Sequence, residues 1–441
     1  MQRTKLVIVG AAGRDFHNFN LLYRNDAGSE VVAFTAAQIP NIAGRTYPPE
    51  LSGPLYPRGI PIVPEADLPA LVRREGVERV VLSYSDLPHL EVMHNASIAL
   101  AAGATYVLPG PRETTVRSSK PVVSVCAVRT GSGKSPLTRF VSRTLRAAGR
   151  RVAVVRHPMP YGDLAAQAVQ RFATMDDLDR AQCTVEEREE YEPHLAEGVV
   201  VFAGVDYERI LRAAEGEADV VLWDGGNNDL PFYATDLHLV VADPHRAGHE
   251  LTYHPGEANF RMADVIVISK VDSAPPEGIR TVEANAASAN PSAELVRGAL
   301  RISAKDPESI RGKRVLVVED GPTLTHGGMA YGAATLFARQ HGGTIVDARK
   351  SAVGSIARVY ADFPHLERVL PAMGYGESQI RELEATIRGS EAEIVLDGSP
   401  VDLGRLVRVP QPIVNVRYDY EDIGGALDRR LRRFLESHPV R

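Results

Sequence analysis

Short apolar runs alternate with amphipathic segments along most of the chain. The runs are rich in Val and Ile and predict buried strands, whereas the segments between them have the apolar spacing of helices. Strands that alternate with helices are typical of an α/β fold with a mostly parallel sheet. In the first part of the chain the pattern predicts strands at 5–9, 30–35, 79–83 and 105–108 and helices at 17–24, 67–75 and 86–102.

The pattern divides the chain into three regions. Residues 1–118 form an α/β unit of their own, and a boundary rich in Pro, Gly and Ser follows it. Residues 119–305 contain further predicted strands and two polar insertions. Residues 306–441 form a C-terminal α/β region, which we expect to pack on the preceding sheet or to continue it.

The segment 122–135, VVSVCAVRTGSGKS, joins a predicted strand to a glycine-rich turn and then to a predicted helix at 137–148. This order is typical of the phosphate-binding P-loop, in which backbone amides and a helix N-terminus hold phosphate oxygens. The chain has Val128 where the usual spacing places Gly, so the variant K-G-G-x-G-K-[ST] fits better. The predicted nucleotide-binding residues of this loop are Thr130, Gly131, Ser132, Gly133, Lys134 and Ser135.

Three residues of the loop have predicted roles in catalysis. Lys134 reaches the β- and γ-phosphates of ATP, and the Ser135 hydroxyl ligates Mg²⁺. Arg129 occupies the first Lys of the variant motif, a position that often contacts phosphate across a dimer interface. We therefore expect a homodimer in which Arg129 assists catalysis. The predicted fold is α/β, with an N-terminal Rossmann-like parallel-sheet domain, a P-loop NTPase domain and a C-terminal α/β extension.

Two later strand ends carry residues that such a nucleotide site needs. Asp224 ends the apolar run of VVLWDGGNND, as the Walker B carboxylate does, and is predicted to be catalytic and to hold Mg²⁺ opposite Ser135. The segment SKVD at 269–272 resembles the base-recognition motif of GTPases, with Lys270 and Asp272 as predicted base contacts. Ser269 replaces an Asn there, so we expect adenine rather than guanine.

Polar clusters in four segments supply candidates for the acceptor site. They lie at 10–20, 156–164, 184–194 and 321–334, and the last has the Gly and Thr density of a second anion-binding turn before a helix at 329–340. The charge run at 184–194 is interpreted as a solvated helix face, in which Arg188 and His194 are the residues to test. Asp163 is a further candidate ligand for Mg²⁺. The candidate substrate-binding residues are Arg14, His17, Arg156, His157, Tyr161, Arg188 and His326.

Composition narrows the classes of function. The 441 residues are 44% hydrophobic and 24% charged, which is ordinary for a globular enzyme. A net charge of −6 argues against a general nucleic-acid partner. Two cysteines give no disulfide framework, and no apolar run approaches the length of a membrane span. We expect a cytoplasmic enzyme that acts on a small molecule.

Six segments together resemble those of cyclic 2,3-diphosphoglycerate synthetase. They are GAAGRDFHNFN, AVRTGSGKS, RHPMPYGDL, VVLWDGGNND, HPGEANFRMADVIVISKVD and EDGPTLTHGGMAYG. The resemblance spans nearly the whole chain and implies an ATP- and Mg²⁺-dependent ligase. Such an enzyme activates one phosphate of 2,3-bisphosphoglycerate, or of a similar phosphorylated acid, so that the second phosphate closes an anhydride ring.

Two other classes of function remain open from the sequence. One is a GTPase of the regulatory or metallochaperone type, which needs a metal-ligand cluster that the sequence does not display. The other is a ligase like dethiobiotin synthetase, in which phosphate activates a carboxylate or carbamate. Nucleotide hydrolysis with and without 2,3-bisphosphoglycerate distinguishes the three.

Overall fold

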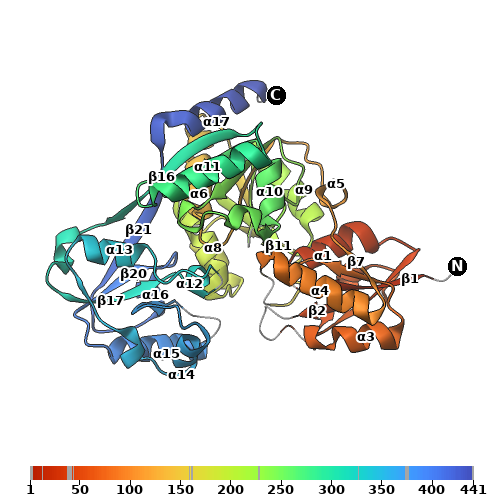
Figure 1. Cartoon of the computed structure of the whole chain (residues 1–441), viewed down its shortest axis with the longest axis horizontal. Coiled ribbons are helices and arrows are strands. Elements are labelled where there is room, and N and C mark those ends of the chain that lie inside the picture. Colours follow the sequence, from red (N-terminus) through yellow and green to blue (C-terminus); the bar gives the residue numbers. More distant parts are fainter. Residues whose placement is uncertain are drawn as a thin grey trace.

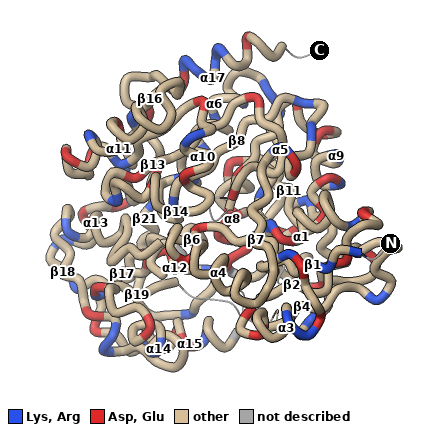
Figure 2. Tube along the Cα trace, turned by 45° about the vertical axis from the view of Figure 1, so that its right-hand side comes forward, with Lys and Arg blue, Asp and Glu red and all other residues tan. Residues whose placement is uncertain are grey.

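Two large sheets carry the three regions of the chain. Figure 1 shows an N-terminal lobe, a central part and a C-terminal lobe, with helix α8 (Val185–Ala196) among them. In the view of Figure 2, acidic and basic residues are interspersed along the trace, so the net charge of −6 does not come from one acidic face. The computed structural model describes residues 3–11, 13–36, 42, 44–157, 159, 162–226, 229–325, 327–372 and 377–439.

The first sheet belongs to the N-terminal lobe and has the order β3-β4-β2-β1-β5-β7. All its pairs are parallel except β3 with β4, as a Rossmann-like unit requires. Its strands are β1 Thr4–Val9, β2 Ser29–Ala36, β3 Thr46–Tyr47, β4 Ile60–Pro64, β5 Arg79–Leu82 and β7 Thr105–Val107. Its main helices are α1 Arg14–Asn18, α3 Leu68–Glu75 and α4 His89–Ala102.

The second sheet has 13 strands in the order β10-β11-β9-β12-β8-β13-β15-β16-β21-β20-β17-β18, with β19 paired to β17. Its central strands are buried on both faces, which explains their continuous apolar sequences. Its strands are β8 Val122–Ala127, β9 Val152–Arg156, β10 Val169–Phe172, β11 Val200–Gly204, β12 Val220–Asp224, β13 Leu237–Ala242, β15 Val265–Ile268, β16 Glu294–Ala304, β17 Arg314–Glu319, β18 Thr344–Ile345, β19 Leu370–Pro371, β20 Ile394–Gly398 and β21 Ile413–Asp422.

Strand β16 connects the central part to the C-terminal lobe. Its first half pairs in parallel with β15, and its second half pairs antiparallel with β21 over Gly298–Ala304. The C-terminal strands therefore continue the central sheet. The helices around this sheet include α6 Lys134–Ala147, α7 Met175–Arg180, α8, α9 Tyr207–Glu217, α10 Gly256–Met262, α11 Pro276–Ala289, α12 Gly321–Thr325, α13 Ala333–Gln340, α14 Gly354–Asp362, α15 Glu377–Arg388 and α17 Ala426–Ser437.

Two short strands join the N-terminal lobe to the central part. β6 (Leu87–Pro88) pairs antiparallel with β14 (Tyr253–His254), far away in sequence. This strand pair lies directly before the start of α4 and brings the turn before β6 next to the P-loop. Residues of the first lobe thereby become part of the candidate site.

The region around α13 differs from the sequence prediction. The helix begins at Ala333 rather than at 329, and Glu319 lies at its N-terminus. The Glu319 carboxylate accepts hydrogen bonds from the amides of Ala334 (3.3 Å) and Thr335 (2.8 Å). The prediction of an anion-binding turn for a ligand is therefore wrong at this helix, because a carboxylate of the chain itself occupies the amides.

Candidate active site

The P-loop connects β8 to α6, as the motif predicts. Gly131 and Gly133 have φ values of 77° and 104°, a left-handed conformation that favours glycine. Helix α6 begins at Lys134, so its N-terminal amides follow directly from the loop. Thr323 of α12 lies beside the loop, since a Cβ at Gly131 would come within 3.2 Å of its methyl group. The C-terminal lobe thus closes over the P-loop.

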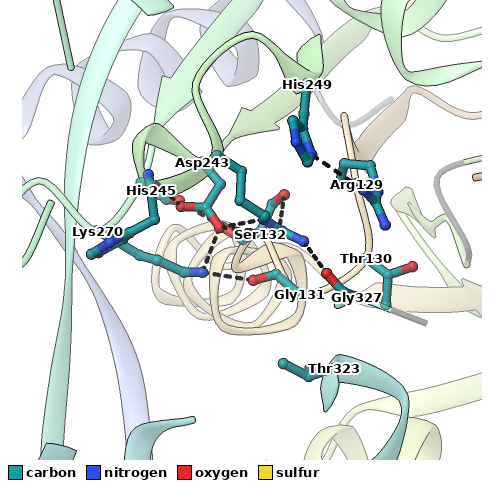
Figure 3. Close-up of polar contacts among 12 residues, drawn as sticks. Arg129, Thr130, Gly131, Ser132, Asp243, His245, His249, Lys270, Thr323 and Gly327 are labelled. Carbon is teal, nitrogen blue, oxygen red and sulfur yellow. Dashed lines mark hydrogen bonds and ion pairs between the residues drawn. The ribbon is translucent and has the colours of Figure 1, made fainter. Parts of the chain in front are cut away.

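The SKVD segment holds the backbone of this loop in place (Figure 3). Lys270 Nζ donates to the Gly131 carbonyl at 2.7 Å and pairs with Asp243 at 2.8 Å. The Ser269 hydroxyl donates to the Ser132 carbonyl at 2.6 Å. Burial lowers the pKa of Lys270, although Asp243 opposes the shift. Asp272, the predicted base contact, is exposed, and its carboxylate accepts from the Leu300 amide at 3.2 Å.

Arg246 and Asp243 complete this support, and neither residue was predicted from the sequence. Arg246 donates to Ser132 Oγ at 3.2 Å and pairs with Asp243 at 3.0 Å. It also donates to the Gly327 carbonyl at 2.8 Å, which ties the C-terminal lobe to the loop. A signal was present in the sequence, because Asp243 follows the end of an apolar strand just as Asp224 ends its own strand.

Asp224 is the centre of a buried cluster of charges. It is 1% exposed, and its carboxylate binds Lys134 Nζ at 2.5 Å and His194 Nε2 at 3.1 Å. Arg156 lies 3.5 Å from the same carboxylate, and the Thr138 hydroxyl donates to it at 3.3 Å. Burial alone raises the pKa of Asp224, but Arg156, Lys134 and His194 outweigh burial and hold the pKa well below its usual range. The carboxylate is therefore ionised throughout the neutral range.

The polar segment 156–164, which starts at the last residue of β9, contributes to the same cluster. Arg156 donates to the Asp224 carbonyl at 2.8 Å and forms an ion pair with Glu190 of α8. His157 pairs with the buried Asp229 at 2.6 Å. Asp163, predicted as a Mg²⁺ ligand, accepts from the amides of Ala165 and Ala166 and so stabilises a turn. Its metal role stays a prediction.

Helix α8 contradicts the interpretation of the charge run as a solvated face. Thr184 and Glu187 form a capping box, and Glu186, Glu187, Glu189 and His194 are buried. His194 binds Asp224, whereas Arg188 pairs with Asp179 and, at 3.1 Å, with Glu192. The run is buried because α8 packs between the central sheet and the C-terminal lobe, where His194 pairs with Asp224 and Glu190 pairs with Arg156.

Two candidate substrate ligands lie at the junction of the lobes. Arg14 donates to the Leu230 carbonyl and to Thr114 Oγ1, both at 2.9 Å. His17 contacts the Thr114 carbonyl at 2.7 Å, and its ring stacks on Phe232 with centroids 3.9 Å apart. Burial, with Arg14 nearby, lowers the pKa of His17 to about 3, so its ring is neutral. Tyr161 and His326 lie outside the described residues, and all these substrate roles stay predictions.

Arg129 lies against the N-terminal lobe of its own chain. Its Nε pairs with Asp86 at 2.8 Å, and its guanidinium stacks over Tyr253, 3.8 Å from the ring centroid. Asp86 also accepts from the Thr130 amide at 3.3 Å, so one carboxylate holds two consecutive loop residues. These contacts favour a role of Arg129 within its own chain rather than across a dimer interface. The homodimer stays a prediction.

Removing one charge of the Arg129–Asp86 pair is expected to lower the unfolding free energy more than removing both charges does. Arg129→Ala leaves a buried carboxylate uncompensated, which costs about 3 kcal/mol of unfolding free energy. The double variant Arg129→Ala/Asp86→Asn is expected to recover most of that loss. Denaturant unfolding of the two single variants and the double variant measures the coupling. Additive losses would contradict the pairing, and recovered activity in mixtures of Arg129→Ala with Lys134→Ala subunits would restore the assignment across a dimer.

Comparisons with known proteins identify the family. No known family model matches the chain. The chain is 56% identical over 437 residues to arginine synthetase ArcE of Thermococcus kodakarensis, an alignment that covers 99% of this chain and 97% of that protein. The chain belongs to the arginine synthetase family. It is accordingly an ATP-dependent ligase-type enzyme, as the sequence predicted.

The comparisons confirm the predicted resemblance only as a distant relationship. Cyclic 2,3-diphosphoglycerate synthetase of Rubrobacter xylanophilus is 26% identical over 306 residues, covering 60% of this chain and 66% of that protein. It is therefore a more distant relative than the arginine synthetase. Among solved structures, LpxK of Aquifex aeolicus in complex with ATP overlaps with a TM-score of 0.40 at 13% identity, covering 73% of this chain and 90% of LpxK.

The described part of the chain has neither a membrane-spanning helix nor a metal-ligand cluster. None of its helices is long and apolar enough to cross a membrane. Its His, Cys, Asp and Glu residues form no group of three or more with the arrangement of a metal site. A metal-ion cargo site, as a metallochaperone needs, is thus not found among the described residues.

Proposed function

We propose that this enzyme makes arginine, using ATP to activate the carbon that becomes the centre of the guanidinium group. The observation that carries the proposal is the 56% identity to an arginine synthetase over 99% of the chain. The P-loop and the charge cluster around Asp224 supply a place for the phosphoryl donor. The acceptor is an amino acid with a ureido side chain, and ammonia supplies the new nitrogen.

The chemistry explains why ATP is needed. A ureido carbon carries two nitrogens and one oxygen, and the oxygen is a poor leaving group. Transfer of the γ-phosphoryl group to that oxygen gives ADP and an O-phosphoryl isourea. The nitrogen of ammonia then attacks the carbon, the C–O bond breaks, and phosphate leaves with the former ureido oxygen and one proton of the ammonia. Phosphoryl transfer of this kind depends on positioning and on neutralising charge.

Residues of the cluster suit this step. Lys134 lies at the N-terminus of α6 and 2.5 Å from Asp224, and Arg156 lies on the other side of the same carboxylate. When phosphates bind the loop amides, Lys134 moves from the carboxylate to the phosphates, while Arg156 and His194 keep Asp224 in place. Lys134 and Arg156 then offset the negative charge that develops on the phosphoryl group during transfer.

Mg²⁺ fits this donor set only together with the nucleotide. Ser135 follows Lys134 in the first turn of α6, and the Asp224 carboxylate pairs with Lys134. One hydroxyl and one carboxylate suffice for an ion that takes its other ligands from phosphate and water. Bound there, Mg²⁺ would neutralise charge on the β- and γ-phosphates.

A product assay tests the proposal. Enzyme incubated with ATP, ammonium and citrulline is expected to form arginine, ADP and phosphate in equal amounts, as measured by mass spectrometry. A parallel reaction with 2,3-bisphosphoglycerate is the control. If the control forms a cyclic anhydride and the first reaction forms no arginine, the proposal is wrong and the enzyme has the activity of the more distant family.

ATP is expected to be preferred over GTP by at least about tenfold in kcat/KM. The residue that replaces the usual Asn, Ser269, is bound to the Ser132 carbonyl, and Lys270 is bound to the Gly131 carbonyl. Both side chains therefore support the loop. Steady-state kinetics with the two nucleotides measures the ratio. A preference for GTP would make Asp272 the base reader and support the regulatory GTPase.

A further inference from the structure

Helix α8 carries the Glu189 carboxylate into the interior of the protein. Glu189 is 7% exposed, and its Oε1 has no hydrogen-bond partner among the residues that the structure describes. Its neighbours on the helix differ, since Glu187 caps the helix and Glu190 pairs with Arg156. A buried carboxylate without a partner is costly to keep. Its presence therefore indicates a binding role rather than a structural one.

The groups that face Glu189 are also acidic. They come from three parts of the chain, namely Asp320 after β17, Asp397 in β20, and Glu186 and Glu190 on α8 itself. Asp320 accepts from the Thr323 hydroxyl at 2.5 Å, and Asp397 accepts from Ser399 and from the Leu403 amide at 3.0 Å. Burial raises the pKa of Asp320 and of Asp397 to about 6. We call Glu189, Asp320 and Asp397 the acidic pocket.

The acidic pocket adjoins the nucleotide site through two connections. Glu190, next to Glu189, pairs with Arg156, which in turn lies 3.5 Å from Asp224. Thr323, bound to Asp320, lies beside Gly131 of the P-loop. Asp320 follows the carboxyl end of β17, and Asp397 lies near the carboxyl end of β20, its parallel neighbour. Ligands of α/β sheets bind at this edge.

We propose that the acidic pocket binds a cationic nitrogen group of the amino-acid substrate, either its guanidinium or its α-ammonium group. The buried Asp397 and Glu189, together with the partly buried Asp320, give this group charge-assisted hydrogen bonds. The described residues form no group with the arrangement of a metal site, which favours an organic cation over a metal ion. The choice of an amino acid rests on the proposed function, whereas the preference for a cation rests on the pocket alone. A bisphosphorylated acid would be repelled there.

Glu189→Gln tests the pocket because it keeps the shape of the side chain and removes its charge. With ADP and phosphate as co-substrates, the KM for arginine is expected to rise about tenfold, equivalent to about 1.4 kcal/mol. The KM for ADP is expected to stay within about twofold, since Glu189 does not contact the P-loop among the described contacts. Glu192→Gln is the matched control on the same helix, because Glu192 pairs with Arg188 at 3.1 Å. An unchanged KM for arginine in Glu189→Gln would overturn the proposal.

Calorimetric titration identifies which nitrogen group is bound. N-acetylarginine keeps the guanidinium and lacks the α-ammonium group, whereas citrulline keeps the ammonium and lacks the guanidinium. Glu189→Gln is expected to lower the affinity for one of these two ligands. The ligand whose affinity falls identifies the nitrogen group that the pocket binds. Equal affinities of wild type and variant for both ligands would overturn the proposal. Thermal unfolding at pH 8 serves as the folding control, and the variant is expected to be at least as stable as wild type.

Failure of the proposed function can be distinguished from failure of the pocket. If wild type makes no arginine, the proposed function fails, and the pocket is tested by the thermal shifts that arginine, ornithine and lysine produce. Stabilisation by these cations that Glu189→Gln loses and Glu192→Gln keeps supports the pocket. No stabilisation of wild type by any of them overturns it.

Discussion

Replacing Lys134 by Ala is expected to lower turnover about 10³-fold while the fold stays intact. The loss is large because Lys134 is the cation at the start of α6, where the proposed reaction places the β- and γ-phosphates, and a preorganised charge at the transferring group contributes several kcal/mol. The fold survives because Asp224 keeps Arg156 at 3.5 Å and His194 at 3.1 Å. Arginine formation and circular dichroism measure the two effects.

Two further variants sharpen this result. Lys134→Arg is expected to remain strongly impaired, because a planar guanidinium does not replace a compact ammonium in the loop. Lys313→Ala is the control, since Lys313 pairs with Glu393 at the surface and lies in the C-terminal lobe. A folded Lys134→Ala protein with near-normal turnover would remove the P-loop from the mechanism.

Asp224→Asn is expected to have the second-largest effect, on both stability and turnover. The amide cannot balance Lys134, Arg156 and His194, so buried positive charge loses its partner at a cost of about 3 kcal/mol. Because the pKa of Asp224 is lowered in the folded state, its contribution is complete above the ordinary carboxyl pKa of about 3.9 and is lost as the pH falls further. The cost of the variant is therefore expected at pH 7 and shrinks below about pH 4.

Unfolding and metal titration measure this prediction. Nucleotide should still bind, because the P-loop amides remain, while the dependence of turnover on Mg²⁺ weakens. Asp219→Asn is the control, since Asp219 pairs at 2.7 Å with Arg151, an exposed residue, and such surface pairs contribute less than about 1 kcal/mol. An unchanged metal profile together with unchanged stability would make Asp224 a turn residue.

Local sequence was sufficient to predict the strand, turn and helix of the P-loop because their signals are contiguous. The apolar strand, the glycines with left-handed φ and the start of α6 all lie within 122–135. The structure has this order as predicted, although α6 begins at Lys134 rather than at residue 137. The position of Asp224 was predictable for the same reason, since it is the last residue of the apolar strand β12. The prediction of ATP and Mg²⁺ as cofactors follows from these local signals, and the site for Mg²⁺ remains a proposal.

The partners of these residues could not be predicted, because they come from distant parts of the chain. Arg129 meets Asp86 across the junction of two lobes, and nothing near either residue indicates the pairing. The polar run of α8 has the composition of an exposed helix, and only the packing of the C-terminal lobe makes it an interior one. Glu319 likewise reaches the amides of α13 across a loop. Burial by long-range contacts is thus what the local pattern missed.

Transfer of an isotopic label tests the central claim most directly. Citrulline labelled with ¹⁸O in the ureido group is incubated with the enzyme, ATP and ammonium, and the phosphate is analysed by mass spectrometry. The proposed reaction predicts one ¹⁸O atom in each phosphate released, with ADP and unlabelled arginine as the other products. Arginine formed with unlabelled phosphate, or with AMP and pyrophosphate, would contradict phosphoryl transfer to the ureido oxygen.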